Sequence, residues 1–496
     1  MKKMNLLVMS LVSAAALSFS SCSNNDDLTG GGTQSQADGV YMTLKISGAT
    51  SHGTRTSVTD GKTTTDNGSV AESTITEGMM YIYDGPTCVF RKVITKDMFE
   101  TAPTQTTSGV TKPIKVAVTG AITTGKKYDV YFLANRTNVD NPIAATSIFT
   151  STTGGADFAT DNNFVMFNQN DGTKAAAHSK VEFTDAAKSD KSPAAAGEIK
   201  LDRVVARIDN PSFDESVKTV TPAKNTTTSI NVADVVAGIS YEGFAVSNLN
   251  NNSYVMQNWD QKFETLNVKW GEPKYSLPKS DYGTLYNAAG LENFSSKEQP
   301  VSWKYAFENT TPNADEATAV YFKVKVALTE TAMAASDFKD GTFYRYDGRL
   351  YTSIQAIYND AATGAISNPF TETNSITPAN VVAKITKDGK LTTDETVLAK
   401  FREDYKIEVY RQGVMYYRWA ISDNAYKPFI ASETTHTYSV LRNSIYRLKV
   451  TKVSEIGKDV PNGPEPDDPV KNPNFYMNVT VSINPWVLNA QPIELK

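Results

Sequence analysis

The last stretch of the chain constrains its fold most, because it reads as a long strand that needs a sheet. Residues Asn474–Lys496 read NFYMNVTVSINPWVLNAQPIELK. Apolar side chains occupy every second position, at Phe475, Met477, Val479, Val481 and Ile483. A period of two predicts a β-strand with one buried face. The partner sheet belongs either to the same subunit or to another copy.

A proline-rich, acidic segment separates this strand from the rest of the chain. Residues Pro461–Pro473 read PNGPEPDDPVKNP. Prolines and charges at this density predict a stiff, solvated spacer rather than a packed element. The C-terminal strand is therefore expected to be tethered to the body rather than built into it. Pro485 is expected to end its first ladder, so that Trp486–Leu495 makes separate contacts.

Length and composition are those of a soluble multidomain protein. The 496 residues suffice for two or three domains with sizeable cores. Forty-nine basic and 54 acidic residues give a net charge of −5, which provides no electrostatic footprint for nucleic acid. Three histidines and 24 tyrosines favour strands over imidazole chemistry.

The N-terminus reads as an export signal. Basic residues at Met1–Lys3 precede an apolar run, Leu6–Phe19, that is short for a membrane span. Two serines then precede Cys22, which predicts a lipoprotein signal over residues 1–21 with lipidation at Cys22. A plain secretory signal with an incidental cysteine is the alternative. Cys88 is then the remaining cysteine and is expected to be a small buried residue in a strand.

The folded part begins with a strand followed by a polar loop. In Val40–Ser47, the apolar residues Val40, Met42, Leu44 and Ile46 alternate with polar ones. The next segment, Gly48–Ser69, holds mostly Gly, Ser, Thr and Asp and contains Arg55, the first arginine of the chain. Because it has almost nothing to bury, it is expected to be a protease-accessible loop.

Short apolar or alternating stretches recur between turn signals along the rest of the chain, and convincing amphipathic helices are few. This spacing predicts a mainly β protein with two β-sandwich-like domains, over residues 56–220 and 221–460. The predicted strands are Met79–Tyr83, Thr87–Val93, Ile114–Val118, Tyr128–Asn135, Phe164–Phe167, Ile199–Ile208, Ile239–Ser247, Trp303–Phe307, Ala319–Leu328, Phe343–Tyr346, Phe401–Val409, Met415–Ile421 and Ile445–Val453.

The sequence contains no catalytic or metal-binding set with usable spacing. It has no HExxH or CxxC pair, no phosphate-binding glycine loop and no GxSxG turn. We therefore expect no catalysis, no cofactor and no metal site. A surface glycan-binding lipoprotein that uses the aromatic stretch Tyr410–Trp419 is an alternative function, and a secreted hydrolase is a third with less support.

The two terminal strands suggest how copies could assemble. Cleavage after Arg55 would release the first strand and expose a hydrophobic groove with unpaired backbone groups. The C-terminal strand of a second copy could fill that groove by donor-strand addition. Because donor and acceptor surfaces differ, such contacts do not close and give a filament. On the pattern alone, pairing of both strands within their own subunit remains open.

Several stretches, in order along nearly the whole chain, resemble the Bacteroidales fimbrillins, the subunits of type V pili. In the first half these are VYMTLKIS followed by GTR, MMYIYDG, YDVYFLAN, FVMFNQN and IKLDRVVARID. The second half is similar to the major shaft subunit of short (minor) fimbriae, in GFAVSNLNNNSYVMQ, WKYAFENTT, AVYFKVKVAL, YRWAI, LRNSIYRLKVTKV and MNVTVSINPW.

The resemblance implies a fimbrial subunit that supports adhesion and biofilm formation. It implies transthyretin-like sandwiches, export as a lipidated outer-membrane precursor, and a propeptide over residues 22–55 that is removed by an arginine-specific protease between Arg55 and Thr56. A host without such a protease would cut elsewhere in Gly48–Ser69. The donor strand, residues 474–496 after the 461–473 spacer, would use Phe475, Met477, Val479, Val481, Ile483 and Trp486. Expected partners are further copies, anchor and tip fimbrial subunits, and surface receptors.

Overall fold

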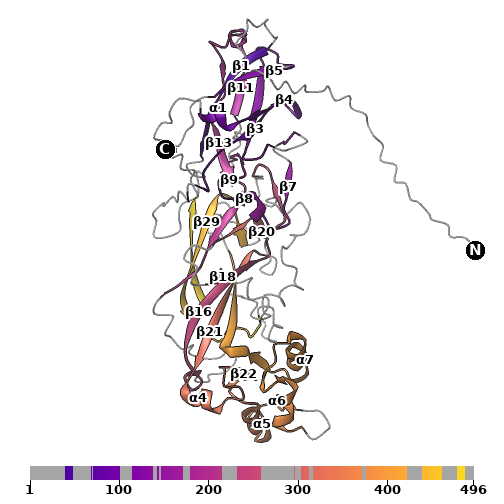
Figure 1. Cartoon of the computed structure of the whole chain (residues 1–496), viewed down its shortest axis with the longest axis vertical. Helices are drawn as coiled ribbons and strands as arrows, with labels where there is room; N and C mark the ends of the chain where they lie inside the picture. The colour runs from indigo at the N-terminus through magenta and orange to yellow at the C-terminus, as the bar shows by residue number, and fades with distance from the viewer. Residues whose placement is uncertain are drawn as a thin grey trace, which may run out of the picture.

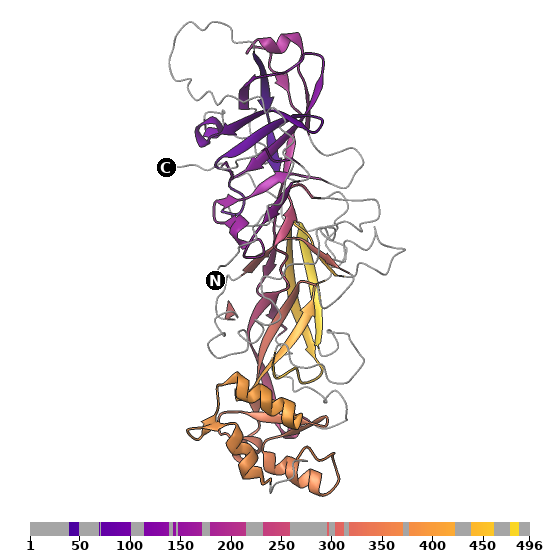
Figure 2. The ribbon, with the colours of Figure 1, turned by 90° about the vertical axis from the view of Figure 1, so that its right-hand side faces the viewer.

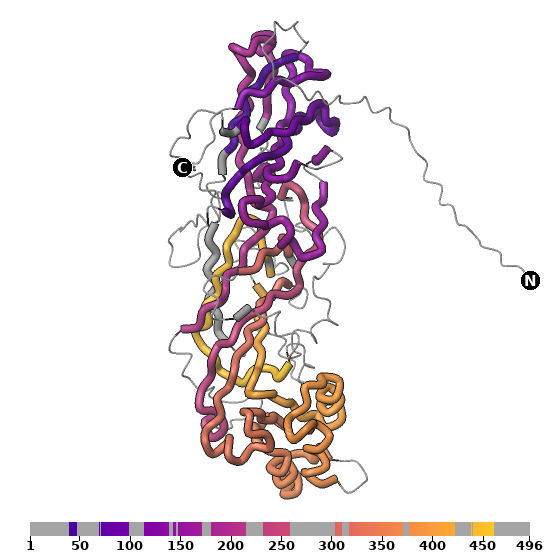
Figure 3. The backbone as a smooth tube through the Cα atoms, in the orientation of Figure 1, coloured from indigo at the N-terminus to yellow at the C-terminus, as the bar shows by residue number. Residues whose placement is uncertain are grey.

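The fold comes from a computed structural model of the chain, and it is elongated (Figures 1 and 2). The structure describes residues 39–48, 69, 71–100, 114–137, 142–144, 147–170, 179–214, 232–257, 295–296, 303–311, 317–370, 376–421, 438–460 and 477–485. Sequence order follows the long axis from indigo to orange, and the yellow strand β29 (Ser444–Val453) returns towards the middle (Figure 3).

Two sheets enclose the first hydrophobic core and form what we call the first sandwich. One sheet has the order β12-β1-β5, and the other β2-β13-β10-β6-β3-β4, with β11 also paired to β6. Their bounds are β1 (Gly39–Leu44), β2 (Ile46–Gly48), β3 (Gly78–Asp84), β4 (Thr87–Ile94), β5 (Ile114–Thr119), β6 (Lys127–Ala134), β10 (Met166–Asn168), β11 (Ser179–Glu182), β12 (Ala194–Ala195) and β13 (Ile199–Arg203).

The central strands of this sandwich explain their apolar sequences. Residues 130–134 of β6 are all buried, as a strand covered on both faces requires. Its neighbour β3 begins at Gly78, where a Cβ atom would lie 2.3 Å from the ring of Phe132. Only a glycine admits this close approach.

A second pair of sheets encloses the second core and forms the second sandwich. One sheet has the order β18-β16-β21-β27, and the other β15-β29-β14-β19, with β30 paired to the free side of β29. Their bounds are β14 (Ala206–Asp209), β15 (Ser212–Phe213), β16 (Val236–Ser247), β18 (Ser295–Ser296), β19 (Trp303–Ala306), β21 (Ala319–Leu328), β27 (Val414–Ala420), β29 (Ser444–Val453) and β30 (Met477–Pro485).

The boundary between the first and second cores lies within a segment that the sequence predicts to be one strand. The predicted strand Ile199–Ile208 is interrupted at Val204 and Val205, so that β13 pairs in the first sandwich and β14 in the second. Val205 belongs to the first core and Ala206 to the second. The sequence does not show this switch, because both halves have the pattern of buried strands.

A helical part at the lower end of Figure 1 encloses a third core and was not expected. It contains α4 (Glu330–Ala335), α5 (Ile354–Ala362), α6 (Pro378–Lys384), α7 (Glu395–Tyr405), β22 (Phe343–Tyr346), β23 (Arg349–Tyr351), β24 (Thr386–Lys387), β25 (Lys390–Leu391) and β26 (Glu408–Tyr410). The remaining elements are α1 (Lys96–Glu100), β7 (Ile148–Thr150), β8 (Ala159–Thr160), β9 (Asn163–Phe164), β17 (Asn252–Tyr254), β20 (Asn309–Thr311), β28 (Tyr438–Val440), η1 (Ala156–Phe158), η2 (Asp185–Lys188), η3 (Val232–Asp234) and η7 (Arg411–Gly413).

The predicted strand Phe401–Val409 is wrong. Most of it lies in α7, which buries Leu398, Phe401 and Tyr405 at helical spacing. The carboxylate of Asp394 accepts a hydrogen bond from the Thr396 amide at 2.9 Å and caps the helix. The predicted strands Ile199–Ile208 and Phe164–Phe167 are each divided into two strands. The other predicted strands of the body are confirmed to within a few residues, and the chain is mainly β as predicted.

Candidate functional site

The N-terminal strand alternates between buried and half-buried positions. Val40, Met42, Leu44 and Ile46 are at most 6% exposed and lie in the first core. Tyr41, Thr43 and Lys45 between them are half-buried. The burial pattern is the one that the sequence predicts, and it places four apolar side chains of one terminal segment inside the sandwich.

This segment is hydrogen-bonded along both of its edges. β1 pairs antiparallel with β5, from Gly39 opposite Thr119 to Leu44 opposite Ile114. On its other side it pairs parallel with β12, and β2 continues the contact parallel to β13. The amide of Ile199 donates to the carbonyl of Lys45 at 2.8 Å. One short segment therefore contributes to both sheets of the first sandwich.

Loss of this segment would remove a large share of the stability of the sandwich. Burial of four such side chains contributes about 1.5–3 kcal/mol each, or roughly 6–12 kcal/mol before entropy. That sum is an upper estimate, yet it is comparable to the whole stability of an ordinary domain, about 5–15 kcal/mol. Unpaired backbone groups on β5, β12 and β13 would add to the cost. A sandwich without residues 39–48 therefore needs a replacement strand.

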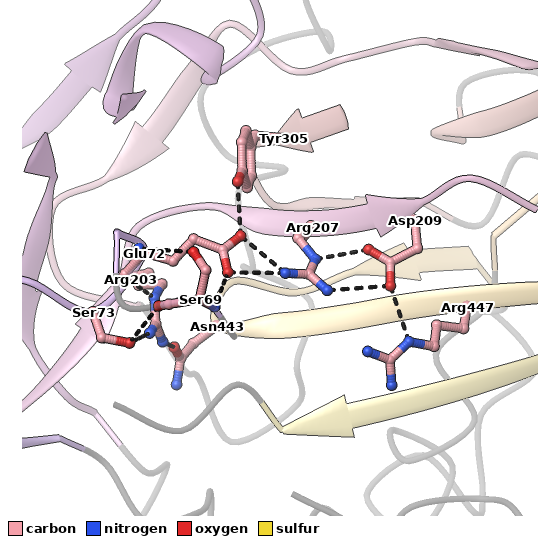
Figure 4. A network of polar contacts seen from close by, with 9 residues as sticks. All are labelled: Ser69, Glu72, Ser73, Arg203, Arg207, Asp209, Tyr305, Asn443 and Arg447. Carbon is pink, nitrogen blue, oxygen red and sulfur yellow. Dashed lines mark hydrogen bonds and ion pairs between the residues drawn. The ribbon is translucent and has the colours of Figure 1, made fainter. Parts of the chain in front are cut away.

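A buried carboxylate lies shortly after the predicted polar loop in the sequence (Figure 4). Glu72 is fully buried and accepts hydrogen bonds from Arg207 Nη1 at 2.9 Å to each of its oxygens. The hydroxyl of Tyr305 donates to it at 2.7 Å, and the amide of Ser69 at 2.6 Å. This carboxylate is satisfied by partners from three separate parts of the chain.

A second arginine holds the backbone of the same segment. The fully buried Arg203 donates from Nε to the Glu72 carbonyl at 2.7 Å, from Nη1 to Asn443 at 3.1 Å and from Nη2 to Ser73 at 3.0 Å. Burial lowers the pKa of this guanidinium to about 9, opposed by the charges of Glu72 and Asp202, so it remains a cation at neutral pH. The segment around Glu72 is thus fixed without help from β1.

The network extends across the junction of the two sandwiches. Arg203 lies on β13, whereas Arg207 and Asp209 lie on β14. Asp209 accepts from Arg207 Nε at 2.7 Å and from Arg447 Nε on β29 at 2.9 Å (Figure 4). We call Glu72, Arg203, Arg207 and Asp209 the junction cluster. It anchors the residues behind the loop to both sandwiches.

A second buried ion pair lies at the same junction. Arg442 Nε donates to Glu308 at 2.8 Å, and Arg442 Nη1 donates to the Val255 carbonyl at 2.8 Å. Glu308 and Arg442 are at most 1% exposed. Arg442 thus joins three segments that are far apart in sequence.

The C-terminal strand lies on its own subunit. β30 runs antiparallel to β29, from Met477 opposite Val453 to Pro485 opposite Ser444, with a bulge near Lys452. β29 is its one strand partner among the described residues, so it is paired along one edge only. Pro485 is the last residue of β30, and the residues after it lie outside the described range. The alternative in which both terminal strands pair within their own subunit therefore describes the uncut chain.

The predicted site residues are only partly within the described residues. Met477, Val479, Val481 and Ile483 share alternate positions on β30. The predicted lipidation residue, the predicted cleavage bond and both ends of the predicted donor strand lie outside the described ranges: Cys22, Arg55, Thr56, Phe475 and Trp486. Their roles remain predictions, as does the division into domains.

Sequence reasoning missed the junction cluster. The signal was present in IKLDRVVARID, where two arginines interrupt an apolar strand and so need buried acceptors. The partner Glu72 could not be identified, since it is more than a hundred residues away along the chain.

The aromatic stretch proposed as a glycan platform is mostly packed. Tyr410, Tyr416 and Tyr417 are at most 4% exposed, and the ring of Tyr410 stacks on Phe343 with centroids 4.5 Å apart. Trp419 is half-buried. These rings therefore serve as core, and the observation behind the glycan alternative is lost. In the described parts of the chain, no group of three or more metal-ligating side chains occurs. None of the helices in those parts is long and apolar enough to cross a membrane.

The solved structures that are similar to the chain include two fimbrial proteins. One is a fimbrilin from Porphyromonas gingivalis W83, at 14% identity and a TM-score of 0.41, covering 91% of this chain and 99% of that chain. The other is a tip fimbrial protein from P. gingivalis with a C-terminal truncation, at 12% identity and a TM-score of 0.32, covering 90% and 100%. At such low scores the likeness carries no argument.

The comparison with curated proteins finds no significant match. The family comparison is informative: residues 408–492 match the model described as major fimbrial subunit protein type IV, fimbrillin, C-terminal. The matched range begins at β26 and includes β27, β29 and β30. Fimbrillins are structural subunits rather than enzymes, and the match does not separate major from minor fimbriae. Residues 408–492 are therefore similar to the C-terminal part of fimbrillins, in agreement with the sequence resemblance.

Proposed function

We propose that this chain is the precursor of a cell-surface fimbrial subunit that polymerises by protease-triggered donor-strand exchange. The observation that carries the proposal is the N-terminal segment 39–48. It is paired on both edges, buries four apolar side chains and stands directly before the polar loop with Arg55. A single cut in that loop would free it.

Cleavage in the predicted loop would leave the rest of the first sandwich intact. Cleavage after Arg55 leaves the new N-terminal segment attached through Ser69 and Glu72, which the junction cluster holds. The rest of the first sandwich therefore stays in position while β1 and β2 leave. What remains is a preformed site, in which two strand edges are unpaired and apolar side chains of the first core are uncovered.

The C-terminal strand would exchange one set of strand partners for another. On β29 it is paired along one edge, whereas the place of β1 offers hydrogen bonds along two. Each backbone hydrogen bond contributes a net of about 0.5–1.5 kcal/mol. The register gives nine residue pairs between β30 and β29, and six, two and three pairs of residues 39–48 with β5, β12 and β13, so the two positions differ little in ladder pairing. The vacated place also leaves the first core without the four apolar side chains of residues 40–46, and a donor strand with an apolar face would cover it. Because donor and acceptor surfaces differ, repetition gives a filament.

The remaining parts of the proposal concern export and partners. The precursor would be lipidated at Cys22 and carried to the outer membrane, and an arginine-specific protease would release it into the fimbrium. Anchor and tip subunits would cap the two ends of the filament, and surface receptors would bind it, in support of adhesion and biofilm formation.

The proposal is tested by cutting the pure precursor with an arginine-specific protease. The new N-terminus is sequenced, and assembly is followed as a ladder of SDS-resistant multimers. We expect a ladder from the parent chain, none from Arg55→Ala, and none from a chain that is cut but lacks residues 475–496. Monomers from the cut parent chain, or a ladder that survives removal of the tail, would contradict the proposal.

A further inference from the structure

The strand that leaves and the strand that would replace it are alike in sequence. Residues 40–47 read VYMTLKIS, and residues 475–482 read FYMNVTVS. Aligned without a gap, three of the eight positions are identical: Tyr41 with Tyr476, Met42 with Met477, and Ser47 with Ser482. The three other positions that face the core in β1 and β2 are apolar in both.

The likeness exceeds what two amphipathic strands share by necessity. Alternation accounts for apolar residues at the four inward positions, but it does not select methionine at the second of them. Met42 is fully buried at the centre of β1, where side-chain shape matters most. Alternation also does not select tyrosine at the half-buried position 41. The shared Tyr-Met pair fixes one alignment among the even-numbered shifts that keep the apolar face inward.

We propose that residues 475–482 of a second copy occupy the place of residues 40–47, position for position and in the same chain direction. This inference rests on the proposed function and adds the register to it. In β1, Met42 lies opposite Val116 and Thr43 opposite Lys115. The register therefore places Met477 of the donor opposite Val116, and Asn478 opposite Lys115.

The differences between the two segments are of a kind that the site can absorb. Val479 and Val481 each lack one methylene relative to Leu44 and Ile46. Phe475 is larger than Val40, but that position is the first inward one of β1 and is 6% exposed. Such substitutions keep the face apolar without filling the core as closely.

One outward position loses a charge pair. Lys45 Nζ lies 3.2 Å from Glu198, with both side chains at least one-third exposed. Threonine stands at the corresponding position 480 of the donor. A pair so exposed contributes little. The lost charge pair and the smaller residues Val479 and Val481 make residues 40–47 fit the site better than the donor does. The donor therefore enters only after cleavage has released residues 40–47.

Cysteine pairs test the register in the filament. In a background with Cys22→Ser and Cys88→Ser, Lys115→Cys is combined with Asn478→Cys, because directly opposed residues of antiparallel strands are close enough for a disulfide. The shifted control combines Lys115→Cys with Tyr476→Cys, two residues away. Lys115 is half-exposed and pairs with Asp190 on the surface, so its replacement costs little. Thr43→Cys with Lys115→Cys in the uncut chain shows that position 115 oxidises.

After cleavage and oxidation, we expect disulfide-linked multimers from the 115–478 pair, and at least a tenfold lower yield from the 115–476 pair. Multimers that form but link through 476, or through neither position, would overturn the register and leave donor-strand assembly intact. Absence of any SDS-resistant ladder, in the cysteine variants and in the parent alike, would overturn the proposed function and the register with it.

Discussion

The central methionines of the two terminal strands should matter at different stages of the life of the subunit. Met42 is fully buried in the first core of the uncut chain. Replacement of a buried methionine by alanine costs about 2–5 kcal/mol, because it removes transfer free energy and leaves a cavity. We therefore expect Met42→Ala to lower the free energy of unfolding of the precursor by that amount in urea. Thr43→Ala, on the outward face, is the matched control and should change it by less than about 1 kcal/mol.

The same substitution should have no effect on the filament. Cleavage after Arg55 discards residue 42, so multimers made from the Met42→Ala precursor should dissociate on heating in SDS at the temperature of the parent. Met477→Ala should lower that temperature, because position 477 enters the place that Met42 left. Equal weakening of the filament by both substitutions would refute this reasoning, as would a Met42→Ala precursor as stable as the parent.

Three further predictions address the junction, the tyrosines and the unexpected helices. Glu72→Gln should destabilise the precursor by about 3–5 kcal/mol in urea unfolding, because it removes the buried charge between the arginines of the junction cluster; Lys449→Ala, in an exposed pair, should cost below about 1 kcal/mol. Burial raises the pKa of Tyr81 and of Tyr131 from 10.0 to about 12. The folded state then keeps protons that the unfolded state loses, so stability should fall as pH rises from 10 to 12, alongside the ultraviolet absorbance of tyrosinate. Asp394→Ala should cost about 1 kcal/mol through loss of the N-cap of α7, measured in the same unfolding assay; no change would argue against that helix start.

Strands with strict alternation were predictable from the sequence, because the period of two survives in any sheet environment. Val40–Ser47 agrees to within one residue at each end with β1 and β2, and β30 (Met477–Pro485) lies within the predicted C-terminal stretch. α7 was missed because Phe401, Tyr405 and Val409 also satisfy a loose strand pattern. The features that indicate a helix are the helical spacing of Leu398, Phe401 and Tyr405 and the N-cap residue Asp394.

Features that depend on distant pairing could not be predicted. The switch of sheets between β13 and β14 leaves both halves mostly buried, so the sequence shows one strand. The pairing of β30 with β29 could not be predicted either. Alternation shows that this strand has one apolar face, but it does not show which sheet edge the strand joins. The junction cluster needs Glu72 and Arg207 together, and neither identifies the other along the chain.

The central claim is that the place of β1 accepts the C-terminal strand. The most direct measurement is the melting temperature of a chain that is cut after Arg55, lacks residues 474–496, and is mixed with a synthetic peptide of residues 474–485. We expect the cut chain to melt below the precursor and the peptide to restore several degrees, since about 1 kcal/mol corresponds to a few degrees in a domain of this size. A peptide carrying Met477→Asp should restore nothing. A cut chain that melts like the precursor, or a peptide without effect, would contradict the account.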